Sequence, residues 1–163
     1  MPPELRRYLF VEQPLGAFVV NLLLNALIAW GVCRGLAAVP LWGQPSVAGD
    51  TLATAFLLPF LSVLIATPLV RRDARVGKVT PPPGAPDGLA GRLPRPLLVR
   101  ALALGILGLA VAAPPPIAAL ALGGVTAIAM PAFIWVKAAY AAVLGALLAP
   151  TIARMGLADA RVP

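Results

Sequence analysis

The chain has no histidine and only one cysteine, Cys33. A lone cysteine cannot form an internal disulfide, and without histidine the usual zinc, haem and Cys/His catalytic sites cannot be assembled. The sequence also lacks a nucleophile–base pair, a pair of acidic residues within its apolar runs and a phosphate-binding glycine loop. We therefore expect no cofactor and a function other than that of an enzyme.

Charged residues are also scarce, at 12% of the chain against 60% hydrophobic residues. A typical soluble domain has about a quarter of its residues charged, so the composition indicates an integral membrane protein whose main partner is the lipid bilayer. The net charge is +7. Because the basic residues lie in short segments between long apolar runs, without interleaved aromatic residues, we expect no nucleic acid partner.

Four apolar runs have about the length of a membrane span. The first has 19 residues, which at about 1.5 Å per residue match the ~30 Å hydrocarbon layer. It could instead be a signal peptide, since Arg6 and Arg7 precede it, but its length and its two asparagines favour a retained helix. We expect spans at residues 15–33, 51–70, 97–113 and 131–152.

These spans predict an all-α polytopic fold with four transmembrane helices in two hairpins, about 15–70 and about 97–152. A basic loop rich in proline and glycine, residues 71–96, joins them. The prolines at 114–116 should end or break the third helix. Residues 117–130 are short for a span, which favours an interfacial or re-entrant segment, although they could belong to a span. A five-span alternative leaves no polar residues for its last turn.

The lysines and arginines predict the orientation. With four spans, both termini and the central loop share one side, and the opposite side has Arg34 alone. The positive-inside rule therefore places both termini in the cytoplasm, as in a multi-pass protein of the bacterial inner membrane. The central basic residues set this topology or bind anionic lipid headgroups. The basic residues on the shared side are Arg6, Arg7, Arg71, Arg72, Arg75, Lys78, Arg92, Arg95, Arg154 and Arg161.

The two halves of the chain share a weak pattern. A shift of 82 residues places Pro14 on Pro96 and Pro68 on Pro150, each at an equivalent end of a predicted span. Identities beyond this are no more than a chain rich in leucine and alanine gives by chance. The pattern raises the hypothesis of two parallel hairpin repeats about an axis along the membrane normal.

Two stretches carry a resemblance. "PLWGQPSVAGDTLATAFLLPFLSVLIATPLVRR", residues 40–72, resembles a pattern in small uncharacterised bacterial inner-membrane proteins whose two-helix hairpin ends in Pro-Leu-Val-Arg-Arg. The ending "AFIWVKAAYAAVLGALLAPTIA" is similar to the closing helix of the four-span members. The resemblance implies four spans and a family of unknown function, with no catalytic or binding residue to carry over.

Lys137 is the only charge in the last apolar run. A lysine at the centre of a span costs about 2.5 to 3.5 kcal/mol, which makes it a candidate functional residue. A helix beginning near Pro131 places it roughly 9 Å below the outer edge, from where it could also snorkel to the interface. We predict that Lys137 approaches Asp50, with Tyr140 on the same helical face. The alternative for Asp50 is a helix N-cap.

Asn21 and Asn25 lie four residues apart and share one face of the first predicted helix. We expect this face to hold helices together, with a solute pathway as the alternative. Small residues repeat every fourth position in two places, which permits close helix approach. They are Ala141, Gly145 and Ala149, and Gly31 with Gly35.

Two classes of function remain. The first is a structural or accessory subunit that acts through helix packing, in a homo-oligomer or a larger membrane complex. The alternative is a transporter or channel for a small solute or ion, with Lys137, Asp50 and Asn21 along its route. Four short helices leave little internal volume, so the sequence favours the first.

Overall fold

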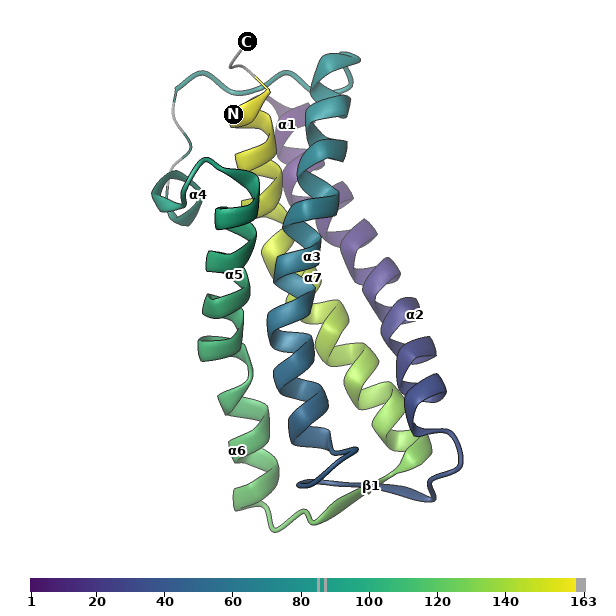
Figure 1. The fold of residues 1–163 in the computed structure, drawn as a ribbon. Helices are drawn as coiled ribbons and strands as arrows, with labels where there is room; N and C mark the ends of the chain where they lie inside the picture. The colour runs from purple at the N-terminus through teal and green to yellow at the C-terminus, as the bar shows by residue number, and fades with distance from the viewer. Residues whose placement is uncertain (85, 87, 161–163) are drawn as a thin grey trace.

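The computed structural model describes residues 1–84, 86 and 88–160 (Figure 1). The fold is all-α, as predicted, and its described residues include four helical stretches long and apolar enough to cross a membrane. Arg161, one of the basic residues used for the orientation, lies outside the described residues. The four stretches are Pro3–Cys33, Val47–Arg75, Leu97–Leu122 and Met130–Asp159.

The first stretch starts twelve residues earlier than predicted. It consists of α1 (Pro3–Arg7), the π-helical turn η1 (Tyr8–Glu12) and α2 (Gln13–Cys33). Pro14 lacks an N–H group and would disturb a regular α-helix at this point. The wider turn, in which Gln13 N–H donates to the Tyr8 carbonyl, lets the helix pass this residue. The helix therefore begins before the predicted span.

The third stretch consists of α5 (Leu97–Ala112) and α6 (Pro114–Leu122), which follow one another along the same side of the molecule (Figure 1). The prolines break the helix at Ala113, and they also begin the next one, because the first turn of a helix needs no backbone donors. Residues 117–122 thus continue the third helical stretch, in line with the alternative that they belong to a span.

The second and fourth stretches are single helices, α3 (Val47–Arg75) and α7 (Met130–Asp159). Both continue past internal prolines and end beyond the predicted residues 70 and 152. The main helix contacts are α2 with α7, α7 with α3, and α3 with α5. The helices therefore follow the order α2, α7, α3, α5, with α2 and α5 at the two sides (Figure 1). The 82-residue shift matches α2 with α5 and α3 with α7. Exchanging the helices of each pair gives the same order read from the other side, which is consistent with a twofold repeat.

The two hairpin loops meet at the end of the bundle that we call the ribbon end. There β1 (Ala38–Pro40) pairs antiparallel with β2 (Ala127–Ala129), Val39 opposite Ile128. Beneath this ribbon Val39 and Phe133 are buried in an apolar cluster with residues of α2 and α3. The sequence did not predict these strands. They join the two hairpins through backbone hydrogen bonds.

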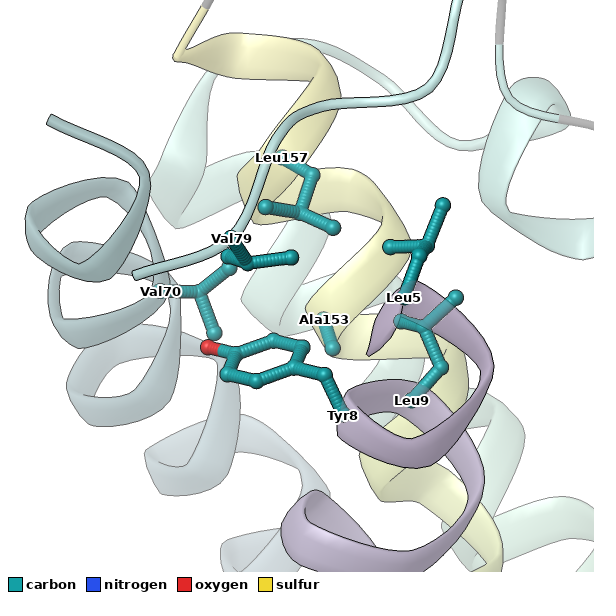
Figure 2. Packing of buried hydrophobic residues seen from close by; sticks show 7 residues of the cluster. All are labelled: Leu5, Tyr8, Leu9, Val70, Val79, Ala153 and Leu157. Atoms are coloured by element: carbon teal, nitrogen blue, oxygen red, sulfur yellow. The ribbon is translucent and has the colours of Figure 1, made fainter. Parts of the chain in front are cut away.

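The opposite end, which we call the terminal end, holds the N-terminus and the last turn of α7 (Figure 1). The loop after α3 folds back onto it and contains the short helix α4 (Leu89–Arg92). Figure 2 shows Val79 of this loop among the side chains of α1, η1, α3 and α7. The predicted loop rich in proline and glycine therefore contributes a buried side chain, Val79, to the core. The cluster is Leu5, Tyr8, Leu9, Val70, Val79, Ala153 and Leu157.

Candidate functional site

A long groove runs between α2 and α3, with α7 as its floor. Its volume is about 520 Å³, and it extends from Glu12 near the terminal end to Asp50 near the ribbon end. The groove exists because α2 is attached to the bundle mainly through α7 and does not pack closely on α3. Its walls are mostly leucine, isoleucine, valine and alanine side chains. Its polar lining includes Asn21, Asn25, Asp50, Thr54, Ser62 and Lys137.

The predicted contact between Lys137 and Asp50 is present at the ribbon end of this groove. The Lys137 Nζ donates to Asp50 Oδ1. The lysine side chain is 5% exposed and the aspartate side chain 23%. Asp50 is not the helix cap, because Ser46 Oγ accepts the Gly49 N–H at 3.1 Å and takes that position. The Asp50 carboxylate is thus free to pair across helices, in the first turn of α3, where the helix dipole favours an anion.

Asn21 and Asn25 line the groove but do not hold two helices together by hydrogen bonds. Asn21 Nδ2 donates to the Ala17 carbonyl at 2.8 Å, and Asn25 Nδ2 donates to the Asn21 carbonyl at 3.0 Å. Both bonds lie within α2, a common alternative for polar side chains in helices. The expected hydrogen bonds between helices are therefore absent from the described residues. Neither amide oxygen accepts a hydrogen bond there.

Tyr140 does not join the Lys137 pair. Its hydroxyl donates to the Ala112 carbonyl at 3.1 Å, at the break between α5 and α6. In a regular helix this carbonyl would accept from the N–H of residue 116, but Pro116 has none. Tyr140 thus satisfies a backbone acceptor that the prolines leave unpaired. The prolines indicate that a backbone carbonyl here lacks its helical donor, but the sequence did not show which side chain would donate to it.

A second group of charges at the terminal end was not predicted. Asp159 Oδ2 accepts from Arg71 Nη2 at 2.6 Å and from Arg100 Nη1 at 2.7 Å, and its Oδ1 accepts from Arg100 Nη2 at 3.2 Å. Arg100 is 3% exposed, and its Nε also donates to the Pro94 carbonyl at 2.9 Å. We call Asp159, Arg71 and Arg100 the terminal triad.

The four central basic residues that were predicted to set the topology or bind lipid headgroups have different surroundings. Arg71 belongs to the terminal triad, and Lys78 pairs with Asp73 at 3.2 Å. Arg72 and Arg75 are exposed, without an ion pair among the described residues.

The small-residue stripe of α7 is used inside the chain. Gly145 faces α2 so closely that an added Cβ would lie 2.4 Å from Asn21 Nδ2. Ala141 and Ala149 are buried on the same helix. Gly31 has open space around it, and Gly35 lies beyond the end of α2. The stripe thus brings α2 against α7, while Gly31 and Gly35 form no helix contact in the described chain.

The groove joins a long apolar wall to a charge-paired end, an arrangement suited to holding an amphiphile or a helix. Within the described residues no group of three or more acidic or cysteine side chains is placed to hold a metal ion. No protein-family model, no curated protein and no solved structure matches the chain.

Proposed function

We propose that the chain is a multi-pass protein of the bacterial inner membrane, with its terminal end in the cytoplasm. The four long apolar stretches support a membrane location. The distribution of charge supports the orientation, because Arg71, Arg72 and Arg75 lie near the terminal end and Arg34 lies near the ribbon end. A cysteine-accessibility assay at both ends in intact cells tests the orientation.

We propose further that the protein is an accessory subunit, not an enzyme, and that it acts through the uncovered face of α2. The observation that supports this role is the low burial of the first stretch. Only 11% of the residues in its most apolar segment are buried inside the chain, against 33% to 39% in the other three stretches. A helix that packs on its own bundle along one side only has a large face available to a second copy or to a larger complex.

Cross-linking in native membranes tests the oligomer. In a Cys33→Ser background, Leu23→Cys on the open face of α2 should form a disulfide-linked dimer. Ile106→Cys on α5 is the matched control, because both side chains are 60% exposed. Dimer at residue 23 and none at residue 106 supports the proposal. A protein that is monomeric by native mass spectrometry and uncrosslinked at residue 23 contradicts it.

A transporter of a small solute or ion is the second candidate, favoured by the groove that runs from Glu12 to Asp50. Lys137→Ala and Asn21→Ala should then each lower flux in reconstituted vesicles. Unchanged flux in both removes this candidate. The accessory role remains the better supported one, because the ion pair neutralises the single buried lysine and the groove is open along its side.

A further inference from the structure

The groove between α2 and α3 is long and narrow. Its Asp50 and Leu69 ends on α3 are separated by 19 residues, roughly 28 Å at 1.5 Å per residue. The groove has about 520 Å³, within the range of roughly 300 to 1,000 Å³ typical of ligand sites. Its length, its volume and its apolar walls therefore suit an extended acyl chain.

The polar groups at the ribbon end of the groove are mainly hydrogen-bond acceptors. Asp50 uses one carboxylate oxygen for Lys137, and its other oxygen accepts no hydrogen bond among the described residues. Further along the groove, on α2, the amide oxygen of Asn25 is likewise without a donor among the described residues. Thr54, one turn after Asp50 on α3, lines the groove with a hydroxyl that has no hydrogen bond in the described chain.

The accessible charge at this end is the anion. The Asp50 side chain is 23% exposed, while the Lys137 ammonium that balances it belongs to a side chain only 5% exposed. Acceptors beside an accessible carboxylate complement a ligand with several N–H donors and a positive charge. A primary ammonium group has both properties. It would meet Asp50 where the apolar walls of the groove begin.

We propose that the groove binds a phospholipid with a primary ammonium headgroup, a phosphatidylethanolamine. Its ammonium donates to Asp50, and one acyl chain lies between α2 and α3 along Leu57 and Leu61. The site requires the membrane location of the proposed function but not the oligomer, because α2, α3 and α7 of one chain build it.

Native mass spectrometry of the full chain from nanodiscs tests this site. The nanodiscs contain phosphatidylethanolamine, phosphatidylcholine and phosphatidylglycerol in equal amounts with identical acyl chains. Phosphatidylcholine keeps the positive charge but has no N–H donor, and phosphatidylglycerol has no amine. We expect phosphatidylethanolamine to be retained about tenfold over either, as the loss of charge-assisted hydrogen bonds implies. Equal retention of the three lipids would overturn the proposal.

Two variants assign the retained lipid to the groove. Leu57→Trp fills the groove and should lower retention severalfold. Leu52→Trp is the matched control, since both leucines lie on α3 with 47% and 44% exposure and only Leu57 lines the groove. Thermal unfolding verifies that both variants fold. Lipid loss in neither variant, or in both equally, contradicts the assignment.

The headgroup contact is tested by Asp50→Asn with Lys137→Gln, which removes both charges and leaves no unpaired ion. This double variant should still bind lipid but lose the preference for phosphatidylethanolamine. An unchanged preference would show that the headgroup is recognised elsewhere.

The same spectra report the oligomeric state from the protein mass. A lipid-bound monomer therefore contradicts the accessory role alone, and a lipid-free dimer contradicts the lipid site alone.

Discussion

The two ends of the bundle hold buried charges in different ways. At the ribbon end, one lysine of α7 pairs with one aspartate of α3, beside an open groove. At the terminal end, Asp159 of α7 accepts from Arg71 of α3 and Arg100 of α5. The first arrangement is charge-balanced and joins two helices. The second has one anion for two cations and joins three.

This difference separates a scaffold from the proposed lipid site. The terminal triad has every carboxylate oxygen engaged, and the burial of Arg100 makes its loss costly. The first stretch is also tied to this end, through Tyr8 and the apolar cluster (Figure 2). The ribbon-end pair leaves the second oxygen of Asp50, a residue that lines the groove, without a hydrogen bond among the described residues. The terminal end therefore fixes the helices, and the ribbon end is where a ligand can exchange hydrogen bonds.

The largest effect should come from Asp159→Asn. This change removes the only anion of the terminal triad and leaves the buried Arg100 without a counter-charge, which should cost about 3 kcal/mol of unfolding free energy. Thermal unfolding in nanodiscs, followed by circular dichroism, measures the change. Glu12→Gln is the control, because the Arg7–Glu12 pair is exposed and should contribute less than about 1 kcal/mol. Equal losses of unfolding free energy in the two variants would mean that the terminal triad stabilises the fold no more than the exposed Arg7–Glu12 pair does.

A smaller loss is expected for Lys137→Met at the ribbon end. The change leaves Asp50 unpaired, but that side chain is partly exposed and sits at the start of α3, so we expect about 2 kcal/mol. Adding Asp50→Leu should recover most of the loss, because two apolar side chains leave no unpaired charge. The same unfolding assay completes the double-mutant cycle. A double variant no more stable than Lys137→Met would show that the two residues are not coupled.

The sequence was sufficient for the four apolar stretches and for the Lys137 pair. Hydropathy over about 20 residues locates a span with little ambiguity. A single lysine in such a span needs a partner, and Asp50 is the acid nearest the matching end of another span. Asp159 gave no such signal, because it lies beyond the last predicted span and its partners are 59 and 88 residues away.

Other features depended on choices that the sequence leaves open. A proline either breaks a helix or begins one, so Pro14 and the prolines at 114–116 did not show that the helices continue. An asparagine amide bonds either its own helix or a neighbour, and Asn21 and Asn25 take the first option. The burial of Val79 follows from the tertiary contacts of a segment without hydrophobic periodicity.

The two tyrosines, one at each of these places in the bundle, extend the comparison to single hydrogen bonds. Tyr140→Phe leaves the Ala112 carbonyl without its donor, at a place where Pro116 cannot supply one. Hydrogen bonds between membrane helices contribute about 0.6 kcal/mol on average and up to about 1.7. We expect about 1 kcal/mol for this one in the unfolding assay, because the prolines leave no backbone replacement. A neutral result would mean that water or lipid reaches the break in the helix.

Tyr8→Phe should have the smallest effect, about 0.5 kcal/mol, although its hydroxyl bond to Asp73 is shorter, at 2.9 Å. Asp73 keeps Lys78 as a partner at 3.2 Å, and its side chain is 26% exposed, so solvent can replace the lost donor. The phenylalanine ring would still pack against Val70 and Val79 (Figure 2). The same assay should therefore rank Tyr8→Phe below Tyr140→Phe. The reverse order would mean that the terminal end depends on this hydroxyl as well as on Asp159, and that its anchoring is shared among polar contacts instead of concentrated in the terminal triad.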